Sequence, residues 1–439
     1  MKITPRQAAV NALMRVEQGS YSNLVLEAYA KEENPSPQER AFAQALLYGV
    51  LERRLTLDHI LSGYSKVPVG KMEPEIRAIL RCALYQLAYM DTPDSAAVNE
   101  AVGLVKATPR LAFNPRLSGF VNGVLRGYLR ADKAFPPLKG GWEERLSVET
   151  ACPRPMLRLY VEALGKKGAE DFLRHSLTVS PNYLRVNTKR TTDAELIQWL
   201  AEDDIPAAPD PLVPHCLAVG RHKSLQNTNQ WEQGFFHLQD KSSQLCVLAL
   251  DAQPDQRVLD VCAAPGGKAF TAAQMMEDTG RIVAMDVHEN RVKLIRRGAS
   301  ALGLDCIYAM QGDATQPGLN MGEFDRILCD VPCSGLGVIR RKPEIKYKNP
   351  EEFENLPSIQ YKILETSANY LKEGGRLVYS TCTLNPKENT EVVDRFLAEH
   401  PDFESDTLPE ALGGGASRLI AHELDSDGFF IAVLKKRMA

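Results

Sequence analysis

The chain has 439 residues, of which 44% are hydrophobic and 25% charged, as in a globular protein of two to four domains. Its net charge of −4 does not indicate nucleic-acid binding, although residues 1–135 carry +4 and the remainder −8. No apolar run is long enough to cross a membrane, and the N-terminus lacks the apolar core of a signal peptide. We expect a cytoplasmic protein without a membrane segment.

The nine cysteines are scattered along the chain, odd in number and without a CxxC pair. This pattern argues against a disulfide framework and against a zinc site. We therefore predict no metal, and nothing in the sequence indicates an obligate protein partner.

Residues 1–135 are predicted to be helical throughout. Apolar residues recur at helical spacing over four ranges, 6–16, 41–51, 76–89 and 120–129. The helix over 76–89 is apolar on most sides, which is typical of a central helix. This part holds no cluster of titratable residues, so we interpret it as a binding or docking module.

A linker at 135–141 is followed by a small mixed α+β segment over residues 142–235. Helices are expected at 155–164, 169–178 and 194–200, strands at 183–187 and 234–238, and a proline-broken loop at 206–214. Arg185, Lys189 and Arg190 are either phosphate contacts or a solvated strand end. A lone strand histidine such as His237 is more often a core residue than a catalytic one.

From residue 236 to the end, strands and helices alternate, which predicts a doubly wound, mostly parallel α/β sheet of the Rossmann-like kind. The expected strands are 257–261, 281–286, 306–310, 325–330, 375–381 and 428–434. The expected helices are 268–277, 289–302, 358–372 and 387–399.

The carboxyl ends of these strands carry glycines and acids, which predicts a ligand site at that edge of the sheet. The first strand–helix turn is small and glycine-containing, so a ligand can approach its backbone. It lacks the GxGxxG pattern and a phosphate-binding cluster of bases, which favours S-adenosylmethionine over NAD. The predicted cofactor residues are Cys262, Ala263, Ala264, Pro265, Gly266, Gly267, Lys268, Asp286, Asp313 and Asp330.

Two cysteines, Cys333 and Cys382, each lie just past a predicted buried strand. Thiols delivered to the ligand edge, one beside Asp330, supply a nucleophile and an acid/base group. Two buried structural cysteines are the plainer alternative.

These motifs resemble the RNA 5-methylcytosine methyltransferases that use two cysteines. The resemblance rests on residues 260–268, Asp286, 330–335, 380–383 and 385–389. Residues 1–135 also resemble the NusB-type RNA-binding domain, through 6–9, 75–80 and 120–126.

Together with residues 335–346, the whole chain resembles the members of that family that act on small-subunit ribosomal RNA. This implies methylation of one cytosine in 16S rRNA, cytosine 967, either in free RNA or in an assembling subunit. Val331 and Tyr347 depart from the residues common in the family, which leaves the RNA contacts open.

The resemblance implies that Cys382 attacks carbon 6 of cytosine and that Cys333 removes the proton from carbon 5. Asp330, in its protonated form, is expected to contact the ring nitrogen. The predicted RNA contacts are Arg126, Arg185, Arg340, Arg341 and Lys342.

Four other functions remain open from the sequence. A DNA cytosine methyltransferase would use Cys333 as its nucleophile. Another alternative is an RNA 5-methylcytosine methyltransferase that acts on tRNA. A non-catalytic rRNA-binding assembly factor would tolerate loss of the glycine turn or of a cysteine, and both are intact. An NAD enzyme lacks its glycine fingerprint here.

Overall fold

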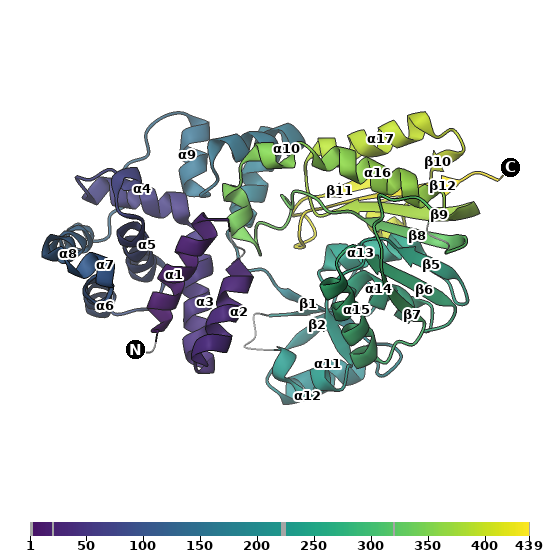
Figure 1. Ribbon diagram of the computed structural model, residues 1–439, viewed down its shortest axis with the longest axis horizontal. Helices are drawn as coiled ribbons and strands as arrows, with labels where there is room; N and C mark the ends of the chain where they lie inside the picture. The colour runs from purple at the N-terminus through teal and green to yellow at the C-terminus, as the bar shows by residue number, and fades with distance from the viewer. Residues whose placement is uncertain (1–2, 20–21, 221–224, 319–320, 439) are drawn as a thin grey trace. The chain divides into compact units, whose positions relative to one another are not determined.

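The computed structural model describes residues 3–19, 22–220, 225–318 and 321–438 (Figure 1). The chain forms two compact units. The first comprises Met1–Leu159 together with Lys342–Lys348, and the second comprises Tyr160–Arg341 and Asn349–Ala439. Short helical turns (η) supplement the helices and strands; they are η1 (Val69–Lys71), η2 (Leu225–Asn227), η3 (Pro343–Tyr347), η4 (Pro350–Phe353), η5 (Pro386–Glu388) and η6 (Glu410–Leu412).

The first unit is helical, as the sequence predicts. Its helices are α1 (Pro5–Glu17), α2 (Ser22–Glu33), α3 (Pro37–Glu52), α4 (Arg54–Tyr64), α5 (Pro74–Tyr89), α6 (Asp94–Ala107), α7 (Pro109–Ala112), α8 (Pro115–Arg130) and α9 (Trp142–Glu149). Proline in the first turn starts α1, α3, α5 and α8, where its missing N–H costs no hydrogen bond.

Helix α5 is the centre of this unit, since it contacts α1, α3, α4, α6 and α8. Its apolar residues are buried on most sides, which confirms the prediction of a central helix. The buried Arg81 on α5 donates to both carboxylate oxygens of Asp58 at 2.7 and 2.8 Å. A buried cation is thus paired within the helical core.

The segment Lys342–Lys348, although distant in sequence, belongs to the helical unit. The ammonium of the buried Lys346 donates to the carbonyls of Glu52 at 2.9 Å and Thr150 at 3.1 Å. The guanidinium of Arg54 lies 3.5 Å from the centre of the Tyr347 ring. These contacts tie a late part of the chain into the N-terminal fold.

The second unit contains an eight-stranded sheet in the order β10-β12-β9-β8-β5-β6-β7, with β11 paired to β12. The neighbours β9, β8, β5, β6 and β7 are parallel, while β10, β11 and β12 are antiparallel additions. Its strands are β5 (Arg257–Asp260), β6 (Arg281–Asp286), β7 (Ile307–Gln311), β8 (Phe324–Asp330), β9 (Leu371–Thr381), β10 (Phe403–Ser405), β11 (Ser417–Ile420) and β12 (Phe429–Lys436).

Helices cover both faces of this sheet, so the predicted doubly wound arrangement is confirmed (Figure 1). Alternate residues of one strand enter different cores: Val258 packs with α13–α15, and Leu259 packs with α16 and α17. The helices are α13 (Lys241–Leu250), α14 (Gly267–Met275), α15 (Glu289–Leu302), α16 (Leu356–Ala368) and α17 (Thr390–Glu399).

A four-stranded antiparallel sheet in the order β2-β3-β1-β4 precedes the larger one in the chain. The elements of this region are α10 (Arg154–His175), β1 (Asn182–Val186), α11 (Asp193–Glu202), β2 (Ala207–Pro209), β3 (Cys216–Val219), α12 (Asn229–Glu232) and β4 (Phe236–Leu238). The non-helical Gly165 (φ 70°) divides α10 into the two predicted helices. The prediction of a loop over residues 206–214 was wrong in part, because β2 lies within this range and pairs with β3.

The expected division into residues 1–135, 142–235 and 236–439 stays a prediction. The four-stranded sheet has an apolar core of its own, but it belongs to the same compact unit as the large sheet. Among the described residues, no helix is long and apolar enough to cross a membrane.

Candidate active site

The turn between β5 and α14 forms one wall of a cavity of about 210 Å³. The cavity lies where β5 has β6 on one side and β8 on the other, which is the switch point at which open α/β sheets bind ligands. Its lining residues are Leu238, Gln239, Asp240, Ser243, Asp260, Cys262, Ala263, Ala264, Pro265, Gly267, Lys268 and Asp330.

Gly266 gives this turn its shape without lining the cavity. Its φ is +117°, and a Cβ there would lie 2.3 Å from the ring of Phe270. Only glycine fits this position, because the backbone is left-handed and the space is filled. The amide of Phe270 donates to the Gly266 carbonyl at 2.8 Å, so the turn leads straight into α14.

Asp260, the last residue of β5, lines the cavity and is 1% exposed. Neither oxygen of its carboxyl group has a hydrogen-bond partner among the described residues. Burial, with a smaller contribution from Asp330, raises the pKa of Asp260 to about 7. A buried acid without donors, facing a cavity, fits a ligand that carries a positive charge.

Lys268 and Asp330 form an ion pair across the cavity floor, with Lys268 Nζ 2.7 Å from Asp330 Oδ2. Burial acts to lower the pKa of Lys268, but the attraction of Asp330 outweighs it and raises that pKa. The hydroxyl of Ser380, on β9, donates to Asp330 Oδ1 at 2.9 Å. Asp330 is therefore held by Lys268 and Ser380, and its predicted contact with the cytosine ring stays a prediction.

Asp286 is the last residue of β6 and Asp313 follows β7 along the same edge of the sheet, but neither lines the cavity. Asp286 accepts from the amide of His288 at 3.0 Å and pairs with Arg291 at 3.0 Å. Arg291 also donates to the Ala264 carbonyl at 2.6 Å and so connects Asp286 to the glycine-containing turn. The predicted cofactor residues thus lie along the carboxyl ends of four neighbouring strands, β8, β5, β6 and β7.

The two predicted catalytic cysteines lie together. Cys333 Sγ and Cys382 Sγ are 3.2 Å apart, although the residues are 49 positions apart in sequence. Cys333 follows β8 and Cys382 follows β9, and these parallel strands are neighbours. The hydrogen bond with Cys382 and then burial raise the pKa of Cys333 well above its ordinary value.

A buried carboxylate joins the two cysteine loops. Glu388 is 0% exposed, and its carboxylate accepts from the Ser334 amide at 2.9 Å and the Ser334 hydroxyl at 2.6 Å. Gln360 and Asn385 each donate to it at 2.9 Å. Ser334 also bonds the hydroxyl of Thr383 at 2.7 Å. The residues that flank Cys333 and Cys382 are therefore held in one network.

The glycine at position 337 allows a further hydrogen bond that holds the Cys382 loop in place. The Gly337 amide donates to the Cys382 carbonyl at 3.0 Å. A Cβ on Gly337 would lie 1.9 Å from the Gly428 carbonyl oxygen and 2.9 Å from that of Cys382. The backbone approach leaves no space for a side chain.

Arg185 is buried at 2% exposure, and its guanidinium donates to Gln274 and to the Pro214 carbonyl. The prediction that Arg185 contacts RNA was wrong, since a phosphate has no access to this interior position. His237, also buried, packs against Phe270, and burial lowers its pKa to about 3. The interpretation of His237 as a core residue agrees with this placement.

Arg340 and Arg341 are occupied by structural contacts. Arg340 pairs with Asp425 at 2.6 Å and donates to the Thr178 hydroxyl at 2.9 Å. Arg341 lies between Asp240 and Asp427, at 2.8 and 3.0 Å. The RNA contacts of Arg340 and Arg341 stay predictions, and either arginine would have to share or exchange these carboxylate partners to bind a phosphate.

Of the predicted RNA contacts, Arg126 and Lys342 are exposed. They belong to the helical unit, where Arg126 lies on α8 and Lys342 begins the inserted segment. They remain candidates for contact with a phosphate backbone.

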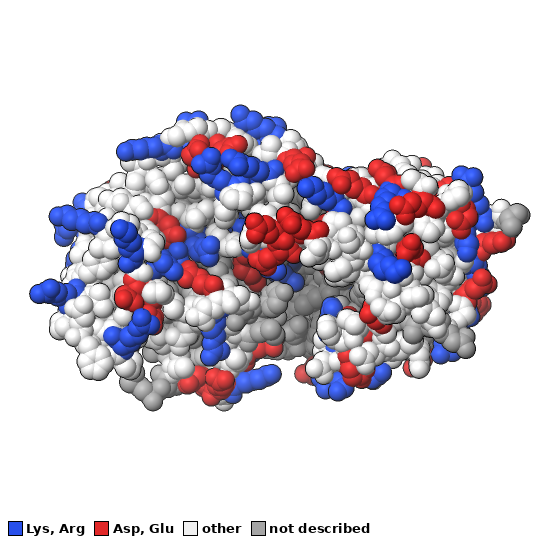
Figure 2. All heavy atoms as spheres, turned by 45° about the horizontal axis from the view of Figure 1, so that its top comes forward, with Lys and Arg blue, Asp and Glu red and all other residues white. Residues whose placement is uncertain are grey.

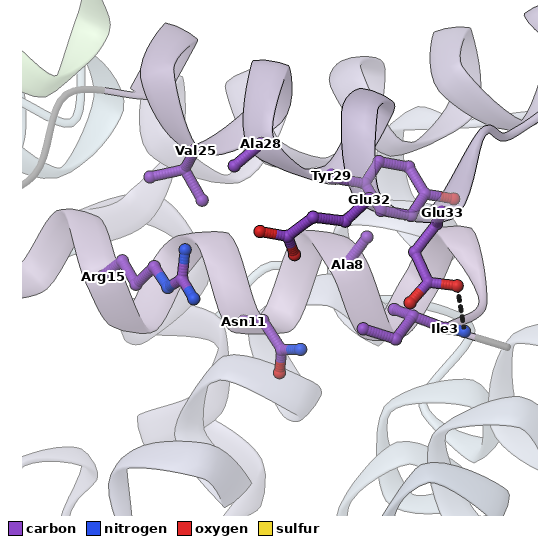
Figure 3. A pocket seen from close by; sticks show the side chains of 9 residues that line it. All are labelled: Ile3, Ala8, Asn11, Arg15, Val25, Ala28, Tyr29, Glu32 and Glu33. Carbon is purple, nitrogen blue, oxygen red and sulfur yellow. Dashed lines mark hydrogen bonds between the residues drawn. The ribbon is translucent and has the colours of Figure 1, made fainter. Parts of the chain in front are cut away.

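The helical unit has a small cavity of its own between α1 and α2 (Figure 3). Its volume is about 50 Å³, enough for one or two water molecules. Arg15 and Asn11 line it from α1, and Tyr29 and Glu32 line it from α2 (Figure 3). This cavity is too small for a cofactor. Within the described ranges, no three His, Cys, Asp or Glu side chains gather as metal ligands do.

Sequence reasoning missed the roles of Asp260, Ser380 and Glu388. Asp260 is the last residue of β5 and Ser380 the next to last of β9. Their place at the carboxyl ends of two strands could have marked them as residues near the ligand site. Nothing in the sequence indicated that Glu388 joins two loops, because two of its three partner residues, Ser334 and Gln360, lie 54 and 28 positions away.

Three family models match the chain. They are "16S rRNA methyltransferase RsmB/F" over residues 247–435, "NusB family" over 3–130, and "Methyltr_RsmF/B-like, ferredoxin-like domain" over 152–226.

A curated relative from Bacillus subtilis, "Probable ribosomal RNA small subunit methyltransferase B", is 37% identical and covers 99% of both chains. The solved structure "Crystal Structure of PH0851" has a TM-score of 0.82 at 24% identity, over 99% of this chain and 100% of that one. A "Methyltransferase Homolog Protein" from Pyrococcus horikoshii has a TM-score of 0.59 at 27% identity, over 68% of this chain and 100% of that one.

Proposed function

The chain belongs to the 16S rRNA methyltransferase RsmB/F family, and from this premise we propose that it methylates carbon 5 of one cytosine in 16S rRNA, cytosine 967, with S-adenosylmethionine as donor. The observation that carries the proposal is the pair of sulfur atoms 3.2 Å apart, on the loops that follow the neighbouring strands β8 and β9. Carbon 5 of cytosine is a weak nucleophile, and a thiol that adds to the neighbouring carbon 6 activates it.

The residues at the cavity fit S-adenosylmethionine. Asp260 has two buried oxygens without donors, suited to a cationic group, and the turn itself lines the cavity at Pro265 and Gly267. Asp286 would accept from ribose hydroxyls and Asp313 from the adenine amino group. When bound, S-adenosylmethionine supplies a methyl group on a positively charged sulfur. The residues of the turn 262–268 would hold it beside Asp330.

We assign the attack on carbon 6 to Cys382. The sulfur must attack as the thiolate, because the thiol is a poor nucleophile. The raised pKa of Cys333 keeps its proton in place, so the Cys333 thiol can donate a hydrogen bond to the Cys382 sulfur and stabilise it as the attacking thiolate. The new sulfur–carbon bond moves electrons onto carbon 5, which then takes the methyl group.

Cys333 then acts as the base. The largest cause of its raised pKa is the hydrogen bond with Cys382, and this cause disappears once Cys382 is a thioether. Cys333 can then release its proton to water and accept the proton of carbon 5. The electrons of that carbon–hydrogen bond restore the ring double bond and expel Cys382 as the thiolate. One proton is released overall.

Asp330 is proposed to contact the cytosine as a carboxylate paired with Lys268. A carboxylate accepts from the exocyclic amino group or from a protonated ring nitrogen. It thereby stabilises positive charge on the ring, which makes carbon 6 more electrophilic. The target base must leave its stack to reach this position.

The proposed substrate is 16S rRNA, free or in an assembling subunit, with Arg126 and Lys342 among its contacts. A cytoplasmic location stays a prediction.

The test uses 16S rRNA that carries tritium on carbon 5 of its cytosines. Methylation at carbon 5 replaces the tritium, so we expect label to appear in water in step with methyl transfer. Methyl transfer without release of tritium would contradict carbon 5 as the target. Release from tRNA but not from 16S rRNA, free or in subunits, would contradict the substrate.

A further inference from the structure

Gln239 lines the cavity at the β5–α14 turn, and the proposed reaction leaves its side chain without a role. It directly follows β4 and is 8% exposed. Its amide nitrogen Nε2 is buried and has no hydrogen-bond partner in the described part of the chain. Among the described residues that line the cavity, only Asp260 and Gln239 have unpartnered side-chain atoms. The cavity wall therefore contains one unsatisfied acceptor group and one unsatisfied donor group, and each is costly without a ligand.

The amide group of Gln239 is held in one orientation by Thr271, a buried residue of α14. The hydroxyl of Thr271 donates to Gln239 Oε1 at 2.5 Å. This separation suits an O–H donor and is short for an N–H donor, so the oxygen of the amide is the atom that faces Thr271. On the other side of that hydroxyl, His237 Nε2 lies 3.4 Å from Thr271 Oγ1. The nitrogen of the Gln239 amide is thus directed away from these partners.

The unpartnered amide nitrogen lies next to the first turn of α14. A Cβ on Gly267, the first residue of this helix, would lie 3.7 Å from Gln239 Nε2. The N-cap residue, Gly266, has no side chain that could accept from the N–H groups of the first turn. These N–H groups and the positive end of the helix dipole attract a negatively charged group. Side-chain and backbone donors therefore lie together at one place on the cavity wall.

The charges around these donors favour a carboxylate over a phosphate. Lys268 is the only Lys or Arg among the described lining residues, and its ammonium is already paired with Asp330. Asp240 and Asp260 add two further carboxyl groups, which repel a phosphate. On the face drawn in Figure 2, acidic and basic side chains are interspersed, so no broad field of one sign there selects the charge of a ligand. Neutral donors suit a singly charged carboxylate that arrives on the same molecule as a cation.

We propose that Gln239 and the first turn of α14 bind the carboxylate of the amino-acid end of S-adenosylmethionine, with Thr271 as the positioning residue of the Gln239 amide. This deepens the proposed function and rests on it for the identity of the cofactor. Asp260 supplies the acceptor for a cationic part of the same ligand. The unsatisfied donor and the unsatisfied acceptor are then both compensated by one zwitterionic molecule, and Gln239 makes the site selective for a cofactor that keeps its carboxylate.

The experiment titrates the full chain calorimetrically with S-adenosylmethionine and with its decarboxylated analogue, which keeps the adenosine, the sulfonium and the amine. The wild type should bind S-adenosylmethionine about 10- to 100-fold more tightly than the analogue. Gln239→Leu should lose most of this preference, because it weakens binding of S-adenosylmethionine and leaves the affinity for the analogue within about twofold. Gln239→Glu should reduce the preference further, since its carboxylate repels that of the ligand.

Two variants of Thr271 test its positioning role through the same ratio of affinities. Thr271→Val removes the hydroxyl and should lower the ratio, whereas Thr271→Ser keeps the hydroxyl and should retain it. A merely structural role of Thr271 would change the affinity for both ligands alike. The control is Gln233→Leu, which replaces an exposed glutamine before β4 and should keep the ratio of the wild type. Thermal melting verifies that each variant folds.

A ratio of affinities in Gln239→Leu equal to that of the wild type would overturn the proposal. So would a loss of affinity for 16S rRNA in Gln239→Leu with unchanged affinity for S-adenosylmethionine, which would assign the donors to a phosphate of the RNA.

Methyl transfer by the wild type separates this inference from the proposed function. If the predicted ratios are found but the wild type transfers no methyl group to 16S rRNA, the carboxylate site stands and the proposed function fails. If the wild type methylates carbon 5 and all variants keep its ratio of affinities, the function stands and this site is wrong. A wild type that binds no S-adenosylmethionine would contradict both.

Discussion

At the scale of single residues, the site depends on carboxylates that differ in their partners. Asp330 has Lys268 and Ser380, Glu388 has four donors, and Asp260 has none among the described residues. A fully bonded buried carboxylate holds structure in place, whereas one without donors is costly unless a ligand compensates it. We therefore propose a positioning role for Glu388 and a ligand-binding role for Asp260, while the catalytic role of Asp330 stays a prediction.

Glu388 is expected to act as a positioning residue for the cysteines. Glu388→Ala leaves four donors unsatisfied, and Glu388→Gln places an amide N–H₂ against donors. We predict that kcat falls about tenfold or more in both, with KM for RNA and affinity for S-adenosylmethionine nearly unchanged.

Steady-state kinetics and calorimetric titration of the cofactor measure these effects. The control is Glu391→Gln, an exposed glutamate three residues further along. An unchanged kcat in the Glu388 variants, or an equal loss of cofactor affinity, would refute the positioning role.

The raised pKa of Asp260 is expected to make the affinity for S-adenosylmethionine depend on pH. Its pKa near 7 means that a proton occupies the carboxyl group at lower pH, and a cationic ligand must displace that proton. The affinity for S-adenosylmethionine should therefore fall as pH drops below about 7, by up to tenfold per unit.

Titration calorimetry from about pH 5.5 to pH 8 measures this dependence. Asp260→Asn should bind more weakly and with a flat profile over the same range. Parallel profiles for the wild type and the variant would show that another group is responsible.

The sequence predicted that the glycine-containing turn and both cysteines lie at one edge of the sheet because each follows a recognisable strand, and the structure places them there. It did not single out Asp260, since the absence of donors is a property of three-dimensional packing. The ion pairs of Arg340 and Arg341 could not be predicted for the same reason: three consecutive cations predict a surface contact, but Asp425, Asp240 and Asp427 lie next to them in the fold.

At the scale of elements, long and strongly patterned segments were predictable and short ones were not. β6 and α15 have the predicted bounds, because each carries a clear apolar pattern. The strands β2, β3, β10 and β11 have three or four residues each, too few to show a period, and their pairing comes from tertiary contacts. α16 ends at Ala368, before the predicted Lys372, because β9 already begins at Leu371.

The buried Lys346, in η3 (Pro343–Tyr347), is expected to make the stability of the protein depend on pH. Burial lowers the pKa of Lys346 from 10.5 to about 8. Between these values the unfolded chain carries a proton that the folded protein lacks, so the free energy of unfolding rises with pH. The full effect is at most about 3 kcal/mol.

Urea unfolding between about pH 7 and pH 10 tests this, with Lys346→Met compared with the wild type. The wild type should gain stability relative to Lys346→Met as the pH rises above 8. The exposed Lys342→Met serves as the control and should follow the wild type. A constant difference between Lys346→Met and the wild type would contradict the assignment.

At the scale of the whole molecule, the helical unit is completed by segments far apart in the sequence. Lys139 is exposed in the linker that follows α8. Helix α9 and the segment Lys342–Lys348 come after this linker in the chain, and both belong to the helical unit. The hydroxyl of Thr56 on α4 donates to the Val148 carbonyl on α9 at 2.6 Å. The N-terminal part is therefore not a detachable module.

Cleavage by trypsin at Lys139 should leave the two fragments associated. They should co-elute in gel filtration under native conditions and separate in denaturant, because α9 and Lys346 still pack against α3 and α4. Elution of the fragments as two native species would show that these contacts do not hold the unit together.

The most direct test of the central claim, two thiols with different roles, compares the wild type, Cys382→Ala and Cys333→Ala. Each is incubated with tritiated S-adenosylmethionine and 16S rRNA and run on a denaturing gel. We predict labelled free RNA with the wild type, no transfer with Cys382→Ala despite intact cofactor binding, and a labelled covalent protein–RNA adduct with Cys333→Ala. Normal release of methylated RNA by Cys333→Ala, or an adduct with Cys382→Ala, would contradict the assigned roles.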